Sequence, residues 1–179
     1  MSDRRWTGAG ELTPADLAAG AAVGVGVALS LASLLLVAQV TGLSPLPAPL
    51  GVAFAKTVLP SGTAGPHGLL WIGLGLHVVY VGSATVGYLA VARDRASAVS
   101  ALGWAAGLWV VAGIVFAPLV GWGWFAAGLG VGGFVNLLAV HAAFGCFVWV
   151  GAQVLYWRGG HAVPAALAGH VGAVAGAQR

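Results

Sequence analysis

Four long apolar runs alternate with shorter polar segments and account for most of the chain. They cover about residues 15–40, 69–92, 98–120 and 132–157. At about 1.5 Å rise per residue, a helix of each run is long enough to cross the roughly 30 Å hydrocarbon core of a bilayer. We therefore predict an all-α membrane protein. Its domain, residues 14–157, is expected to contain four transmembrane helices that form a four-helix bundle of two tandem hairpins.

The connection between the first two runs, residues 42–67, is rich in proline and glycine. Three prolines interrupt any helix at its beginning, and two prolines with two glycines do so at its end. Between these interruptions, residues 50–59 predict a short helix that lies at the membrane surface with Lys56 directed toward the lipid headgroups. An ordered lid over the bundle is the alternative interpretation.

Composition excludes a water-soluble domain. Of the 179 residues, 60% are hydrophobic and only 6% are charged, whereas about a quarter of the residues of a soluble domain are charged. The mean hydropathy of +0.97 agrees with this conclusion. The basic residues do not form a cluster, so we expect the lipid bilayer and not nucleic acid as the partner.

The positions of the basic residues predict the orientation of the chain. With four spans, a single lysine, Lys56, falls on one side, and six arginines fall on the other: Arg4, Arg5, Arg93, Arg95, Arg158 and Arg179. Cytoplasmic segments carry an excess of Lys and Arg. We therefore expect a multi-pass protein of the inner, or plasma, membrane with both ends cytoplasmic. These ends are the N-terminal segment 1–13 and the tail 158–179, and the loop 42–67 lies outside.

Pairs of glycines four residues apart predict close packing of helices. Such spacing lets the backbone of another helix approach closely in lipid. It occurs in or next to three of the four runs, at Gly20 and Gly24, Gly103 and Gly107, and Gly128 and Gly132. We expect a tightly packed bundle that also associates with itself or with a larger membrane complex.

His77 and His141 are the two ionisable side chains deep within the apolar runs. Each lies about nine residues after the expected start of its helix, and both helices run in the same direction. At about 1.5 Å per residue, the two imidazoles are therefore expected at similar depth. Ionisable residues inside a membrane are costly and are candidates for function.

Three interpretations of the two histidines remain open. In the first, each imidazole forms a structural hydrogen bond with a neighbouring side chain or backbone carbonyl. In the second, both bind one haem b as axial ligands of an electron-transfer subunit. In the third, they belong to a pathway for protons or small solutes, which a polar seam would line with Gln39, Tyr80, Ser83, Asn136 and Gln153.

Other chemistry has little support in the sequence. A metal site needs more ligands than two histidines, so we expect neither a metal nor, in the first interpretation, any cofactor. The chain contains no recognisable acid–base carboxylate pair, nucleophile motif or phosphate-binding glycine loop. We therefore expect a protein that is not an enzyme.

Several motifs together resemble a known family. They are a glycine-rich first helix, a proline-rich connection and three short patterns: Trp71…His77…Tyr80, Pro118 with the turn 121–133, and His141…Phe144-Gly145. Over about residues 15–157 the chain resembles the YagU-like family of small inner-membrane proteins. This resemblance implies a four-helix membrane protein in which two histidines recur, without an established chemistry.

Our leading expectation is a small assembling subunit, or an accessory component of a membrane complex or of a transport or stress process. The haem-binding subunit and the proton or solute pathway are the alternatives.

Overall fold

The computed structural model describes residues 13–92 and 95–158, and over these residues the protein is all-helical. Its helices are α1 (Pro14–Val40), α2 (Leu50–Val58), α3 (Pro66–Ala92), α4 (Ala98–Val111), α5 (Ala117–Leu119) and α6 (Gly130–Arg158). A π-helical turn, Ala112–Phe116, joins α4 to α5, and a 3₁₀ turn, Trp124–Leu129, precedes α6.

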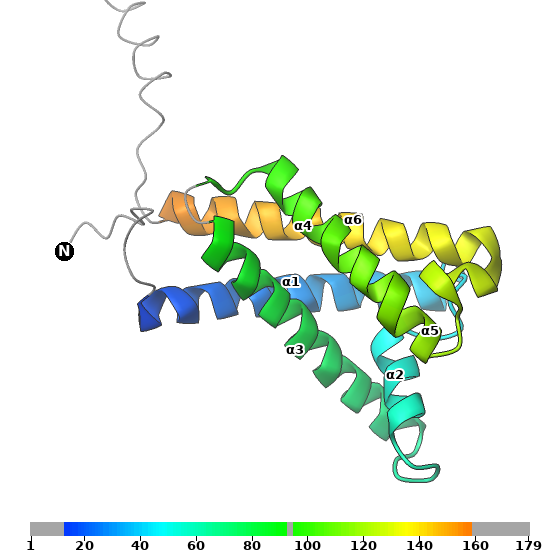
Figure 1. Ribbon diagram of the computed structural model, residues 1–179. Coiled ribbons are helices and arrows are strands. Elements are labelled where there is room, and N and C mark those ends of the chain that lie inside the picture. Colours follow the sequence, from blue (N-terminus) through cyan, green and yellow to red (C-terminus); the bar gives the residue numbers. More distant parts are fainter. Residues whose placement is uncertain (1–12, 93–94, 159–179) are drawn as a thin grey trace, which may run out of the picture.

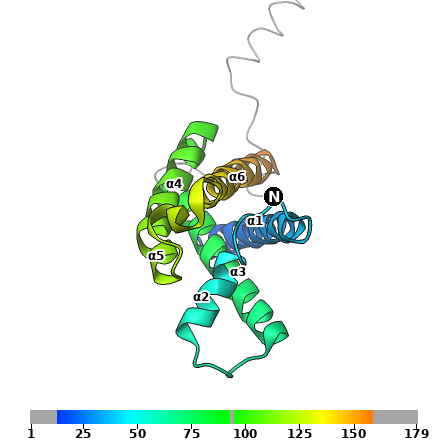
Figure 2. The same ribbon diagram turned by 90° about the vertical axis from the view of Figure 1, so that its right-hand side faces the viewer.

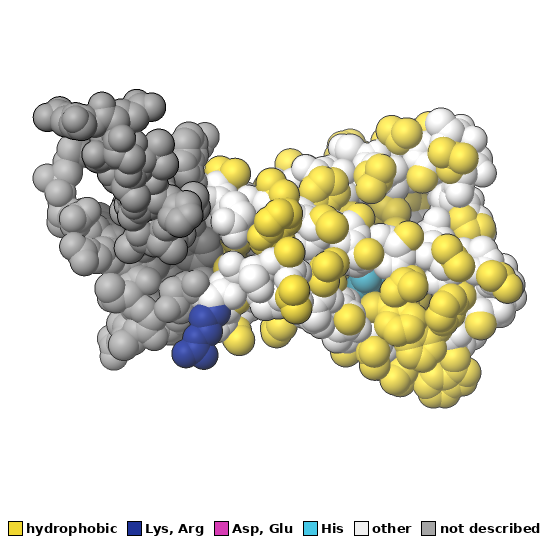
Figure 3. All heavy atoms as spheres, turned by 90° about the horizontal axis from the view of Figure 1, so that it is seen from above, with side chains coloured by type: hydrophobic (Ala, Val, Ile, Leu, Met, Phe, Trp, Pro, Cys, Tyr) yellow, Lys and Arg dark blue, Asp and Glu magenta, His cyan; other side chains and the backbone are white. Residues whose placement is uncertain are grey.

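Four helical segments in the described part of the chain are long and apolar enough to cross a membrane: Pro14–Val40, Pro66–Ala92, Ala98–Leu119 and Trp124–Leu155. The prediction of an all-α chain with four such helices is therefore confirmed. Hydrophobic side chains cover much of the face shown in Figure 3, and many large ones are exposed on all four segments. This is the surface of a multi-pass membrane protein. Residues 1–12 and 159–179 of the expected cytoplasmic segments lie outside the described residues.

Two of the four long segments, α1 and α6, lie side by side, and the other two pack against this pair (Figures 1 and 2). Helix α3 crosses α1 at a large angle, and α4 crosses α6. The beginning of α3 therefore diverges from the α1–α6 pair, and α2 packs against it there. The expected short helix is thus present, and it rests on another helix of the bundle.

Local sequence explains where the helices begin. At α1, the Thr13 side chain accepts a hydrogen bond from the Asp16 amide, and the Asp16 carboxylate accepts one from the Thr13 amide at 2.9 Å. Pro14 occupies the first helical position, where no amide donor is needed. Ser97 and Ser100 form an equivalent reciprocal cap at α4. These caps satisfy amides that have no partner within the helix.

Glycine permits the closest contact between α1 and α3. A Cβ atom added to Gly24 would lie 3.0 Å from both the Cα atom and the carbonyl oxygen of Gly82. One turn earlier, Gly20 faces the side chains of Val86 and Leu89. The expected close packing of this glycine pair therefore takes place within the chain.

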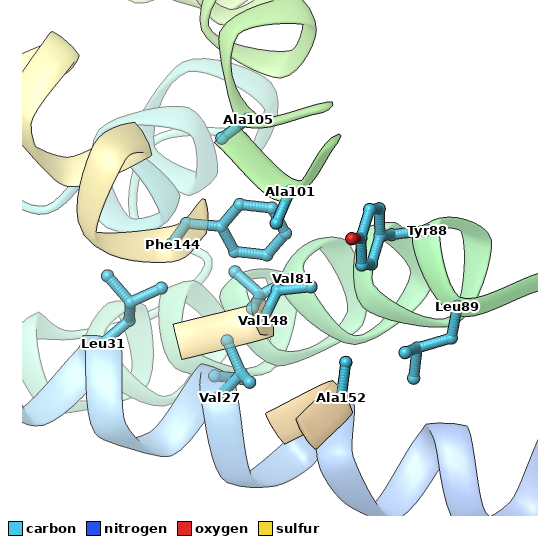
Figure 4. Packing of buried hydrophobic residues seen from close by; sticks show 11 residues of the cluster. Val27, Leu31, Val81, Tyr88, Leu89, Ala101, Ala105, Phe144, Val148 and Ala152 are labelled. Carbon is cyan, nitrogen blue, oxygen red and sulfur yellow. The ribbon is translucent and has the colours of Figure 1, made fainter. Parts of the chain in front are cut away.

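Small residues also permit close contact between α4 and α6. A Cβ atom added to Gly145 would lie 3.1 Å from the Cβ atom of Ala105 and 3.2 Å from the Ala101 carbonyl oxygen. Both alanines are fully covered. Figure 4 shows side chains from α1, α3, α4 and α6 meeting in the main hydrophobic cluster, which includes Val27, Leu31, Val81, Leu89, Phe144 and Val148.

Two polar contacts join α3 to α4 near the ends opposite α2. The indole nitrogen of Trp104 donates to the Ala84 carbonyl oxygen at 3.1 Å. The hydroxyl groups of Tyr88 and Ser100 are 2.8 Å apart. These contacts hold the two helices together where their backbones come close only over a short stretch.

The third span is not the continuous α-helix expected over residues 98–120. Pro118 has no amide hydrogen, and its ring would clash with the carbonyl group four residues earlier, at Ile114, in a regular helix. The preceding turn is widened instead, and the Ala117 amide donates to the Ala112 carbonyl oxygen five residues back. The proline therefore explains the π-helical turn.

We predict that Gly24→Leu destabilises the protein and that Gly26→Leu does not. The added side chain at Gly24 would overlap the Gly82 backbone, whereas an added Cβ atom at Gly26 meets nothing within 4 Å. Overpacking typically costs about 1–3 kcal/mol. Reversible unfolding in mixed detergent–SDS micelles should show this loss for the first variant alone, and equal stability of the two variants would contradict the contact.

Candidate functional site

His77 links α3 to α1. Its half-buried ring places Nε2 at 3.1 Å from the carbonyl oxygen of Ala28. A carbonyl oxygen can only accept a hydrogen bond, so Nε2 carries the proton and donates it. Ala28 is completely covered, and it lies 49 positions away in sequence. The hydrogen bond therefore satisfies a polar group inside the bundle and holds two spans together.

His141 forms a different kind of hydrogen bond. Its side chain is buried, with only 8% exposed, and its Nδ1 lies 2.8 Å from the carbonyl oxygen of Leu137, one turn earlier in α6. Nδ1 is therefore the donor, and the lone pair of Nε2 remains available as an acceptor. This histidine is satisfied within its own helix and does not join two helices.

The hydrogen bond of His77 bears on the haem hypothesis. Axial ligation by two histidines requires each ring to direct a nitrogen toward one iron, but Nε2 of His77 is directed at the Ala28 carbonyl oxygen. Among the described residues, no group of three or more His, Cys, Asp or Glu side chains is placed to hold a metal ion. A haem iron needs only two ligands from the protein, so the haem hypothesis stays a prediction.

The structure places the five residues of the expected polar seam in different environments. Gln39 donates through Nε2 to the Leu46 carbonyl oxygen at 3.1 Å and so ties the end of α1 to the following loop. Ser83 and Gln153 are exposed on the outside of α3 and α6. Only Tyr80 and Asn136 place polar atoms in the interior.

Within the described residues, three buried polar side-chain atoms have no hydrogen-bonding partner: the Tyr80 hydroxyl oxygen, the Asn136 Oδ1 atom and the Trp109 indole nitrogen. An unpaired buried polar group costs about 1–3 kcal/mol, so such atoms commonly mark the position of an internal water or of another polar partner. Trp109 was not among the expected seam residues. Its unpaired donor is evident only in the folded chain.

The aromatic ring of Phe125 fills a space beside Trp109 that the sequence did not indicate. The two ring centroids are 4.6 Å apart. Phe125 has φ 53° and the following residue, Ala126, has φ 60°, a left-handed conformation that costs energy in residues other than glycine. A Cβ atom added to Gly113, in the π-helical turn, would overlap the Phe125 ring. The absence of a side chain at Gly113 therefore leaves the space that the Phe125 ring occupies.

The remaining glycine pairs have different environments. Gly128 packs against the Trp122 backbone, and Gly132 packs against the Pro45 side chain. A Cβ atom added to Gly132 would lie 3.3 Å from the Cβ atom of Pro45. Gly103 and Gly107 have no atom within 4 Å of an added Cβ. Of the expected packing residues, only this last pair has no neighbouring atom within 4 Å of an added Cβ.

We predict that His77→Phe lowers the free energy of unfolding by about 0.6–2 kcal/mol, the usual range for a hydrogen bond between membrane helices. The phenyl ring retains most of the packing but cannot donate to Ala28. His67→Phe is the matched control, because His67 is exposed at the start of α3. Reversible unfolding in detergent–SDS micelles measures both, and a loss of equal size in the control would show that the hydrogen bond is not the cause.

Comparison with known proteins found no matching family model, no matching curated protein and no matching solved structure. The resemblance to the YagU-like family therefore stays a prediction that rests on the residues described above.

Proposed function

We propose that the protein is a non-catalytic component of the cell membrane that assembles with a second copy of itself through α4. In this proposal, α1 with α3 and α4 with α6 form two tandem hairpins, and both ends of the chain are cytoplasmic. The even number of spans and the positions of the arginines support that orientation.

The uncovered face of α4 is the observation that carries the proposal. One side of α4 presents Ala101 and Ala105 to α6, where both are covered. The other side is exposed, and most of its residues are small or β-branched at helical spacing, namely Val99, Gly103, Ala106, Gly107 and Val110, with the larger Leu102 beside them. Such a face packs closely against another helix, because small side chains let two backbones approach.

Polar side chains on the outside of other spans support association independently. Ser83 is exposed near the middle of α3, and Gln153 is exposed on α6. Unlike Ser30 and Ser33, whose hydroxyls donate to carbonyls of α1, Ser83 forms no hydrogen bond in the described part of the chain. Polar groups that face lipid gain stability from a partner on another helix.

The geometry of the exposed α4 face favours a second copy of this protein as the partner. A twofold contact places the same face of both subunits together, and the α4 face is self-complementary because its centre has almost no side-chain volume. Two copies of α4 can therefore cross at Gly103 and Gly107 with their backbones in contact.

We predict that Gly103→Leu and Gly107→Leu each shift the protein from dimer to monomer, because the added side chains separate the two backbones. Gly26→Leu is the control, since Gly26 is also exposed on a span with no atom near an added Cβ. Photobleaching steps of singly labelled protein, counted in dilute lipid vesicles, measure the number of subunits. A monomeric wild-type protein would overturn the proposal, and a dimer that persists in both α4 variants would exclude this face.

The unpartnered atoms of Tyr80, Trp109 and Asn136 favour a second candidate function, a pathway for protons or small solutes. Polar groups inside a membrane protein commonly mark such pathways, and His141 adds a buried ionisable side chain.

For the pathway, we predict proton flux in proteoliposomes that falls close to the level of empty vesicles in Tyr80→Phe and Asn136→Leu. The control is Ser33→Ala, which removes a hydroxyl that is bonded to its own helix at Leu29. A pH-sensitive dye inside the vesicles reports the flux. Wild-type flux no greater than that of empty vesicles would remove this candidate for protons.

A further inference from the structure

A hollow of about 430 Å³ lies between α2 and the beginning of α3. This volume falls within the range of about 300–1,000 Å³ that is typical of small-ligand pockets. Its lining residues come from α2 with the proline before it, from the beginning of α3 and from the chain that connects the two helices. Figures 1 and 2 show where these segments lie. Most of its wall is apolar, with Pro49, Val52, Ala64, Pro66, Leu69 and Leu70.

Two polar side chains, Lys56 and His67, complete the wall. Lys56 lies in the last turn of α2 and His67 in the first turn of α3. The only carboxylate side chain in the described part of the chain, that of Asp16, caps the far end of α1 (Figure 1). The charge of Lys56 therefore has no neutralising carboxylate nearby among the described residues.

The position of the hollow along the bundle matches the edge of a bilayer. It lies where the apolar span Pro66–Ala92 begins. One turn after His67, the large side chain of Trp71 is 70% exposed, and exposed tryptophans gather at the level of the lipid headgroups. The cationic part of the hollow and its leucine wall are thus placed beside the polar and the apolar parts of a lipid, respectively.

We propose that this hollow binds an anionic phospholipid from the adjacent leaflet, with the phosphate beside Lys56 and the upper acyl chain against Leu69 and Leu70. The first turn of α3 adds a partial positive charge on the same side, because its leading amides have no helical partner. A zwitterionic phospholipid fills the apolar wall equally well but neutralises Lys56 less effectively. The site therefore selects by headgroup charge.

We predict that the purified full-length protein retains phosphatidylglycerol in preference to phosphatidylcholine in a neutral detergent, and that Lys56→Gln weakens phosphatidylglycerol binding about fivefold. This factor corresponds to about 1 kcal/mol per basic side chain near an anionic surface. Native mass spectrometry of the lipid-bound protein measures both affinities. Lys56→Arg should keep the preference, and Leu70→Gln should weaken the binding of both lipids.

Two controls separate a lipid site from simpler explanations. Arg95→Gln removes one exposed positive charge at the opposite end of the bundle, so an equal loss in that variant would show an effect of net charge and overturn the proposal. Excess inorganic phosphate should leave the phosphatidylglycerol adduct in place, because phosphate has no acyl chain. Displacement by phosphate would assign a free-anion site instead, and an unchanged preference in Lys56→Gln would exclude the hollow altogether.

Discussion

The structure depends on the close approach of helix backbones at residues with little or no side chain. In lipid there is no hydrophobic force that drives one apolar helix against another, so contact between spans relies on van der Waals packing and on a few hydrogen bonds. Packing of this kind weakens steeply with distance. Gly24 against Gly82, and Gly145 against Ala101 and Ala105, bring α1 to α3 and α4 to α6. The large residues of the main cluster then fill the space between the two pairs.

The backbone arrangement also determines which hydrogen bonds the polar groups in the interior can form. Because α1 and α3 approach at Gly24 and Gly82, the imidazole of His77 on the next turns reaches the Ala28 carbonyl oxygen. The beginning of α3 diverges beyond this crossing, and α2 occupies part of the gap. The hollow beside Lys56 lies there, between α2 and the beginning of α3.

The candidate site was predictable in part. The histidines were found because ionisable residues are rare within apolar runs, and the structural hydrogen bond was one of the expected interpretations. The polar seam stays a prediction. Ser83 and Gln153 are exposed on the outside of their helices, and a list of polar residues does not show in which direction each side of a helix faces. The left-handed Phe125 and its fit against Gly113 left no signal in the sequence, since phenylalanine rarely adopts that conformation.

The sequence by itself determined the apolar character of this protein, its helical class and the segments that are long enough to span a membrane. These features depend on stretches of neighbouring residues, such as a continuous apolar run or the helix cap formed by Thr13 and Asp16. Tertiary structure alone decided which glycine pairs are covered and which carbonyl accepts from His77. Those outcomes depend on the crossing angles of helices, and the contacts that set these angles join residues such as His77 and Ala28, which are 49 positions apart.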